Sequence, residues 1–188
     1  MLTDHLTSER LLTALAGLAV VALTVSACTA AVSGQDQSTS SNTATKSGPL
    51  SAADGVLPDH TSAYDTNLPG VAKLGPDLRK AVQRAETAMK ADGISMQVTS
   101  GWRSKKYQKE LLDKAIRKYG SRKKALEYAA DPDKSHHVTG HAVDIGPTAA
   151  DDWLIRRGNR FGLCQTLSKE RWHFELVTTP GAPCPAMS

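Results

Sequence analysis

The sequence is poor in aromatic residues and in long apolar runs, and both shortages exclude classes of protein. Phe, Trp and Tyr make up only 5% of the 188 residues. No basic segment is interleaved with aromatic residues, which argues against a nucleic-acid-binding protein. The apolar run between Leu11 and Val25 is shorter than the about 20 residues that a membrane-spanning helix needs. The net charge of +4 is mild and fits either an ordinary soluble surface or an anionic neighbourhood.

Cysteine is also scarce, and the placement of the three cysteines predicts export. The apolar run ends in Val25-Ser26-Ala27-Cys28, which resembles a bacterial lipoprotein signal followed by the cysteine that becomes lipidated. We therefore predict a signal peptide over residues 1–27 and a lipid on Cys28, with an ordinary secretory signal as the alternative. Cys164 and Cys184 remain, and in an exported chain they are expected to form a disulfide, although two buried thiols are the alternative.

Composition divides the rest of the chain into a tether and one folded domain. Residues 28–57 are rich in Ser, Thr, Ala and Gly and show no hydrophobic period, which predicts a flexible tether after the lipidated cysteine. Residues 58–188 are numerous enough to form one hydrophobic core. Helical and strand patterns are mixed there without a regular repeat, so we expect a single α+β domain with a small, mainly antiparallel sheet.

Within this domain, hydrophobic spacing predicts the main elements. Period-four apolar residues predict a helix over 77–91, and alternation predicts a strand over 94–98. Ser104 and Gly120 are suited to begin and end another helix, and a shorter helix is expected over 121–130. Further elements are predicted as a strand over 141–145, a helix over 148–157 that begins with a capping box of Thr148 and Asp151, and a last strand over 172–177.

Three histidines and an aspartate lie within one short stretch, residues 135–144, and a second cluster follows at 170–175. Neutral imidazoles and carboxylates are the ligands of zinc sites that keep one position open for water. A turn at Gly140 followed by a strand would let His137 and Asp144 face one point, and His173 is the best third ligand. His136 points away from His137 in an extended stretch, and His141 lies on the opposite strand face from Asp144.

The same residues resemble a known family of zinc peptidases. The pattern is Ser135-x-His137-x-x-Gly140-x-Ala142-x-Asp144, followed by Glu170-x-Trp172-His173 and preceded by Ser100-Gly101-Trp102-Arg103-Ser104 with Gln108. It is similar to the VanY-type D-alanyl-D-alanine carboxypeptidases, which belong to a wider group of zinc proteins that also includes D-Ala-D-Ala dipeptidases and the hedgehog amino-terminal domain. The resemblance covers about residues 99–176.

The resemblance implies a role for each matched position. His137, Asp144 and His173 would hold one Zn²⁺, and Glu170 would be the general base. Arg103 would meet the substrate at its terminal carboxylate or at the developing oxyanion. Gln108 and Ser135 would contribute to substrate binding.

Strand geometry leaves a second candidate for the base. His173 and Glu175 share one face of a regular strand, whereas Glu170 is an odd number of residues from His173. Alternation alone therefore favours Glu175 as the base or as a partner of the metal ligand. The family pattern favours Glu170, which requires that Glu170 lie in the loop before the strand.

Together these expectations describe an exported zinc D,D-carboxypeptidase that acts on peptidoglycan stem peptides. We expect a monomer on the outer face of the cell membrane, held there by a lipid anchor, with secretion as the alternative. An L,D-carboxypeptidase or a peptidoglycan endopeptidase of the same zinc group is an alternative activity. A zinc-containing wall-binding module without catalysis is the alternative outside the enzymes.

Overall fold

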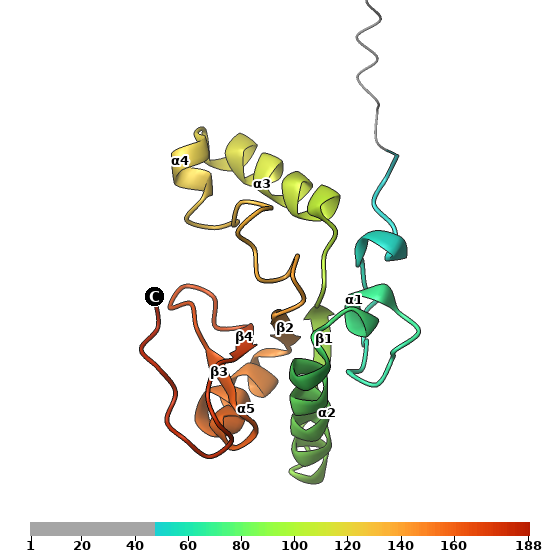
Figure 1. Ribbon diagram of the computed structural model, residues 1–188, viewed down its shortest axis with the longest axis vertical. Helices are drawn as coiled ribbons and strands as arrows, with labels where there is room; N and C mark the ends of the chain where they lie inside the picture. The colour runs from blue at the N-terminus through green and yellow to red at the C-terminus, as the bar shows by residue number, and fades with distance from the viewer. Residues whose placement is uncertain (1–47) are drawn as a thin grey trace, which may run out of the picture. The chain divides into compact units, whose positions relative to one another are not determined.

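Four short strands form an antiparallel sheet in the order β1-β2-β4-β3 (Figure 1). The computed structural model describes residues 48–188 of the chain. The strands are β1 Gln97–Ser100, β2 Ala142–Gly146, β3 Leu163–Gln165 and β4 His173–Leu176. The α+β class with a small antiparallel sheet is therefore confirmed. The predicted signal peptide, Cys28 and most of the tether lie outside the described residues.

Two helices, α2 Pro76–Ala91 and α5 Thr148–Arg157, pack with one face of the sheet to form the main core. Alternation along the strands directs Val143, Ile145 and Phe174 into this core. The apolar stripe of α2 predicted from its spacing is buried, and Trp153 of α5 is completely buried, with its indole N–H donating to Asp92 at 2.7 Å. The opposite strand face is left for polar residues.

Helices α3 Lys105–Tyr119 and α4 Arg122–Ala125 form a hairpin away from α2 and α5 (Figure 1). The Ser104 side chain caps α3 by accepting from the Tyr107 amide, and Gly120 ends it in a left-handed conformation, as predicted. Helix α4 is shorter than the predicted 121–130 segment, because turns follow Ala125. A second, smaller cluster of buried residues holds the hairpin together and comprises Leu112, Ala115 and Ala125.

Several local predictions were wrong in detail. Helix α5 has Pro147 as its N-cap and no side-chain cap, so the predicted capping box of Thr148 and Asp151 is absent. The bounds predicted for this helix, 148–157, are nevertheless confirmed, with Gly158 as its C-cap, and a 3-10 helix, η2 Gly158–Phe161, follows directly. Strand β1 begins later than the predicted start at residue 94. Strand β3 and the short helix α1 Pro69–Ala72 were not predicted from the sequence.

The folded unit begins before residue 58, the predicted boundary. Residues Ala52–Asp54 form a 3-10 helix, η1. The Asp54 carboxylate accepts a hydrogen bond from the Ser104 hydroxyl at 2.9 Å, and the Ser104 amide donates to the Asp54 carbonyl at 2.8 Å. Leu57 packs against the main core. The last residues of the predicted tether therefore belong to the fold and brace the start of α3.

The predicted disulfide between Cys164 and Cys184 is present. It links β3 to the C-terminal segment, which carries Pro180, Pro183 and Pro185 after the last strand. Among residues 48–188, no helix has the length and apolar character that crossing a membrane requires.

Candidate metal centre

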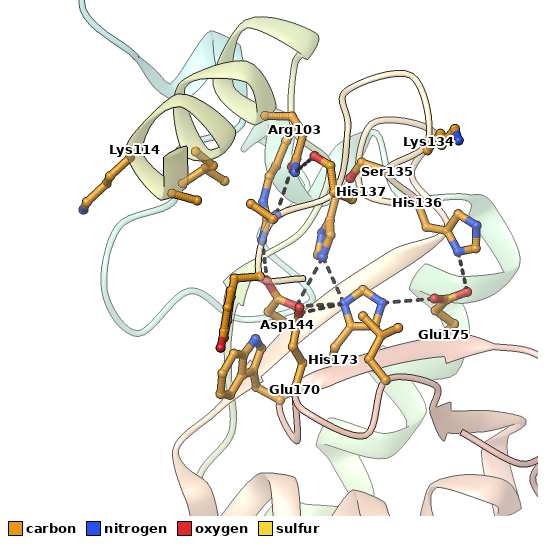
Figure 2. Close-up of a pocket in the computed structure, with 18 of the residues that line it drawn as sticks. Arg103, Lys114, Lys134, Ser135, His136, His137, Asp144, Glu170, His173 and Glu175 are labelled. Carbon is orange, nitrogen blue, oxygen red and sulfur yellow. Dashed lines mark hydrogen bonds and ion pairs between the residues drawn. The ribbon is translucent and has the colours of Figure 1, made fainter. Parts of the chain in front are cut away.

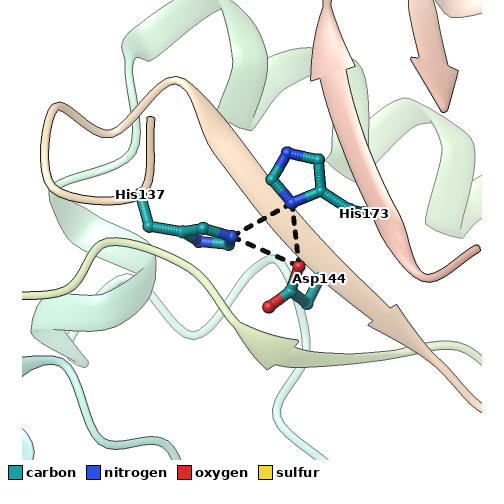
Figure 3. A group of neighbouring side chains, drawn as sticks. All are labelled: His137, Asp144 and His173. Carbon is teal, nitrogen blue, oxygen red and sulfur yellow. Dashed lines mark hydrogen bonds and ion pairs between the residues drawn. The ribbon is translucent and has the colours of Figure 1, made fainter. Parts of the chain in front are cut away.

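His137, Asp144 and His173 meet on the polar face of the sheet, and all three are buried (Figure 3). His137 Nε2, His173 Nδ1 and Asp144 Oδ1 form a triangle in which each pair of atoms is 3.2 Å apart. A tetrahedral zinc ion with bonds of about 2.0–2.1 Å holds its ligand atoms about 3.3–3.4 Å apart. The triangle has the size and the donor atoms of one face of a zinc site.

Strand pairing and one turn bring the three side chains together. Asp144 of β2 lies directly opposite His173 of β4 in the antiparallel register, so their side chains project from the same face. His137 precedes β2 in a turn in which the Gly140 amide donates to the His137 carbonyl at 3.1 Å. Gly140 has φ +75°, and a Cβ atom there would lie 2.4 Å from the Lys73 carbonyl oxygen. The predicted turn of the chain at Gly140 is therefore confirmed.

The remaining ring nitrogen of each histidine is held by the protein. His137 Nδ1 donates to the Gly101 carbonyl at 2.8 Å, and His173 Nε2 donates to Glu175 Oε1 at 3.0 Å. These hydrogen bonds leave the lone pairs of His137 Nε2 and His173 Nδ1 directed at the centre of the triangle. Such partners fix the tautomer and orientation of metal-ligating histidines in proteins.

Arg103 contacts the outer oxygen of Asp144. Its guanidinium donates from Nη2 to Asp144 Oδ2, from Nε to Ser100 Oγ at 2.7 Å, and from Nη1 to Gln108 Oε1 at 3.1 Å. An arginine side chain has five N–H groups, so one on Nη1 and one on Nη2 remain for another partner. Ser100 belongs to the family pattern, but no role was predicted for it from the sequence.

The pKa shifts of Asp144 and His173 show that the site stabilises a positive charge next to its carboxylates. Burial by itself raises the pKa of Asp144, but His137, His173 and Arg103 hold it well below the usual range. Burial lowers the pKa of His173, yet hydrogen bonds to Asp144 and Glu175 and their charges raise it to about 9. A divalent cation would supply this positive charge, and its binding would displace the protons that the ligands hold.

Glu170 lies in the loop between β3 and β4, as its assignment as the base requires. Its Oε2 atom is 4.0 Å from His173 Nδ1, the nitrogen that faces the triangle. Its carboxylate is partly exposed to the cavity, and burial raises its pKa. Glu170 is therefore the acidic side chain placed to exchange protons beside the candidate ion.

Glu175 lies behind His173, on the side away from the triangle (Figure 2). Its Oε1 accepts from His173 Nε2 and from Thr166 Oγ1 at 2.9 Å, and its Oε2 contacts His136 Nδ1 at 2.7 Å. Burial opposes ionisation, but these hydrogen bonds lower the pKa of Glu175 to about 2. The geometry favours the alternative in which Glu175 orients a metal ligand. His136 points away from the triangle, as predicted, but its bond to Glu175 was not anticipated.

A cavity of about 500 Å³ opens onto the triangle. Ser135 and Trp172 line it, and Trp172 is 43% exposed. Gln108 also lines it, but its carbonyl oxygen accepts from Arg103 and its amide donates to the Ala130 carbonyl at 2.9 Å. Gln108 thus holds Arg103 in place, whereas the predicted role was substrate binding. His141 is exposed and contacts Thr139, away from the ligands.

Comparison with known proteins identifies relatives of the chain. It is 28% identical to a D-alanyl-D-alanine carboxypeptidase of Enterococcus faecalis over 115 residues, which cover 48% of this chain and 43% of that protein. It is 26% identical to the putative carboxypeptidase YodJ of Bacillus subtilis over 148 residues, covering 66% of this chain and 54% of that protein. The chain therefore spans about half the length of these curated relatives.

Solved structures share the fold. A vancomycin-resistance D,D-pentapeptidase VanY in complex with Zn(II) superposes with a TM-score of 0.53 at 25% identity, covering 56% of this chain and 73% of that one. The LD-carboxypeptidase LdcB has the same fold, with a TM-score of 0.53 at 24% identity over 66% of this chain and 68% of that one.

A family model also matches the chain. The family model described as VanY, D-alanyl-D-alanine carboxypeptidase, matches residues 71–179, which include all three residues of the triangle as well as Glu170 and Arg103. Because this match extends over more than half of the sequence, the chain belongs to the VanY family.

Proposed function

We propose that the chain is a zinc carboxypeptidase that hydrolyses the terminal D-alanyl-D-alanine bond of peptidoglycan stem peptides. The triangle of His137 Nε2, His173 Nδ1 and Asp144 Oδ1, with sides of 3.2 Å, carries this proposal. Membership of the VanY family and the Zn(II) bound by the related pentapeptidase support it. One zinc ion per chain would be held by these three residues.

The residues around the triangle would have different roles in hydrolysis. A zinc ion there would polarise the scissile carbonyl and make a water molecule acidic enough to attack it. Glu170 takes the proton of the water and later gives it to the leaving amine, for which a raised pKa is suitable. Glu175 and Gly101 hold the two imidazoles in the orientation that this geometry needs.

Arg103 and Ser135 are placed to bind the end of the peptide. The free N–H groups of Arg103 stabilise either the terminal carboxylate or the negative charge that develops on the carbonyl oxygen. Ser135 lines the cavity next to His137, and its hydroxyl has no side-chain partner among residues 48–188 (Figure 2). A carboxylate anchored by Arg103 would restrict cleavage to the end of a peptide.

The decisive experiment is release of D-alanine from a synthetic stem pentapeptide that ends in D-Ala-D-Ala. We expect release by the zinc-loaded protein, no release after chelation, recovery on adding zinc, and one zinc per chain by elemental analysis. A matched peptide with an L,D terminal bond tests the alternative specificity. Cleavage of that peptide alone would overturn the D,D assignment, and full zinc loading without any cleavage would favour a binding module.

We also propose that the enzyme is exported and tethered through a lipid on Cys28. The apolar run that ends at Cys28 supports this proposal. The wild-type chain should sediment with membranes after expression in a bacterium, whereas a Cys28→Ser variant should not. A wild-type chain that stays in the supernatant would argue against the lipid anchor.

A further inference from the structure

His136 and His137 are neighbours in the chain, but they approach the metal centre from two sides (Figure 2). His137 directs its Nε2 atom into the triangle, 3.2 Å from His173 Nδ1. The His136 ring points the other way, and its Nδ1 atom lies 2.7 Å from Glu175 Oε2. Glu175 in turn accepts a hydrogen bond from His173 Nε2 at 3.0 Å. The two neighbouring histidines therefore reach opposite sides of His173, one directly and the other through Glu175.

The backbone of His136 is fixed by the same turn that presents His137. The His136 carbonyl accepts hydrogen bonds from the His141 amide at 2.8 Å and from Thr139 Oγ1 at 3.1 Å. The ring extends from this fixed backbone to Glu175, which is 39 residues further along the chain. This contact therefore connects the turn that carries one metal ligand to the strand that carries another.

The two carboxylate oxygens of Glu175 have separate partners. Oε1 accepts from His173 Nε2 and from Thr166 Oγ1, whereas His136 Nδ1 is the one partner of Oε2 within residues 48–188. An ionised carboxylate only accepts hydrogen bonds, so Nδ1 of His136 carries the proton in this contact. The Glu175 side chain is 10% exposed, and a buried charge that lacks partners is unfavourable. Without His136, the carboxylate would rotate toward other donors, and Oε1 would lose its alignment with His173.

The exposure of His136 distinguishes this role from packing. Its side chain is 60% exposed and lines the cavity, and neither cluster of buried residues includes it. Removal of the ring should therefore change the hydrogen bonding of Glu175 much more than the stability of the fold.

We propose that His136 is a positioning residue of the metal centre: it holds the Glu175 carboxylate in the orientation that directs the lone pair of His173 Nδ1 at the ion. This inference rests on the metal centre of the proposed function, but not on cleavage of any particular bond. Direct partners of metal-ligating histidines typically change metal affinity by about 10–100-fold when they are removed. His136 acts one contact further out, so a smaller loss, of about 2- to 10-fold, is expected.

Substitutions of His136 test this role through zinc affinity. His136→Ala should raise the zinc dissociation constant by about 2- to 10-fold. His136→Asn should keep the wild-type value, because its side-chain amide places an N–H group close to the position of Nδ1. His141→Ala is the matched control, because His141 is exposed in the same stretch but contacts Thr139 and does not line the cavity. Competition with a chelating dye measures the constants, and urea unfolding with chelator present compares the stability of the variants.

A double-mutant cycle shows whether the effect passes through Glu175. In a Glu175→Ala background, His136→Ala should cause no further loss of zinc affinity. An equal loss in both backgrounds would show that His136 acts independently of Glu175 and would overturn the inference. A loss in His136→Asn as large as that in His136→Ala would also overturn it, because the donated hydrogen bond would then not be the cause.

The remaining outcomes separate this inference from the proposed function. Equal zinc dissociation constants for the wild type and His136→Ala would overturn the inference alone, and a raised KM with these constants equal would make His136 a peptide contact. If zinc binds but no peptide is cleaved, the proposed cleavage fails, and the zinc dissociation constants still decide the inference.

If the wild type binds no zinc, the proposed function fails, and the Nε2 proton of His173 in the metal-free protein decides the inference. NMR should then show faster exchange of this proton with water in His136→Ala than in the wild type and His136→Asn. Equal exchange in the three proteins would reject the inference.

Discussion

At the scale of single residues, the two glutamates near His173 have opposite environments. Glu175 is buried, accepts hydrogen bonds from His173 and Thr166, and has its pKa lowered to about 2. Glu170 is partly exposed and has its pKa raised by burial. A carboxylate that stays ionised suits the orientation of a ligand, and one that exchanges its proton more readily suits catalysis.

Substituting glutamine at each position should separate these roles. Glu170→Gln should lower kcat by about 10²–10⁴-fold while zinc remains bound, because the amide cannot accept the proton. Glu175→Gln should weaken zinc binding by about 10-fold or more, because the ligand loses its charged partner, and turnover should persist at saturating zinc. Steady-state kinetics and zinc titration measure both effects. Loss of turnover only in the zinc-saturated Glu175 variant would reverse the assignment.

Asp151 is a buried carboxylate that the catalytic proposal does not use. It is 5% exposed, and its Oδ1 atom has no hydrogen-bond partner within residues 48–188. Burial raises its pKa to about 6, although Arg171 opposes the shift. Between its unfolded pKa and about 6 the folded state holds the extra proton, so the contribution of Asp151 to stability falls as the pH rises through this window.

Asp151→Asn should remove this part of the pH dependence. The free energy of unfolding of the wild type should lose this contribution between about pH 4 and pH 6, and the variant should lose less over the same range. Urea unfolding of both proteins in the presence of chelator measures the difference without a contribution from zinc. Parallel pH profiles for the two proteins would show that Asp151 is not the group responsible.

At the scale of elements, the turn before β2 determines where His137 lies. Gly140 adopts φ +75°, and its carbonyl accepts from the Gly75 amide at 2.8 Å. A side chain at this position meets both a backbone conformation that L-residues disfavour and the carbonyl of Lys73. The ligand-bearing loop is therefore held against the start of α2 by a contact that only glycine allows.

Replacing this glycine tests the contact against a matched control. Gly140→Ala should destabilise the fold by more than the about 1–2 kcal/mol that a left-handed alanine costs, and it should weaken zinc binding by displacing His137. Gly93→Ala is the control, because Gly93 has φ +74° but a Cβ atom there would meet no other part of the chain within 4 Å. Equal losses of stability in the two variants, measured by urea unfolding, would show that the Lys73 contact is unimportant.

The elements with strong periodicity could be predicted from the sequence. So could the proximity of His137 and Asp144, which only a short turn separates. Helix α2 and the capped helix α3 were predicted almost to the residue, since apolar spacing and capping residues are local signals. Strand β3 was missed because three residues carry no recognisable alternation. The Arg103–Asp144 contact joins residues 41 apart, and the His136–Glu175 contact joins residues 39 apart. Such pairs depend on tertiary packing, so spacing alone could not reveal them.

At the scale of the whole molecule, one covalent link ties the last residues to the sheet. Cys164 of β3 and Cys184 are 20 residues apart, and closing a loop of that length stabilises the folded state by about 3 kcal/mol on the loop-entropy model. Replacing both cysteines with alanine should therefore lower the free energy of unfolding by about this amount. Urea unfolding of the double variant, compared with the wild type before and after reduction, measures the loss. An unchanged midpoint would mean that packing alone holds the tail.

The two clusters of buried residues lie on either side of the cavity. The main core supports Asp144 and His173 through β2 and β4, and the smaller cluster of Leu112, Ala115 and Ala125 supports the wall that carries Lys118. If the proposed function holds, substitutions in the α3–α4 hairpin can change which peptides bind in the cavity without altering the metal ligands. Under the proposed function, peptide selectivity can then diverge between related proteins that keep the same metal centre.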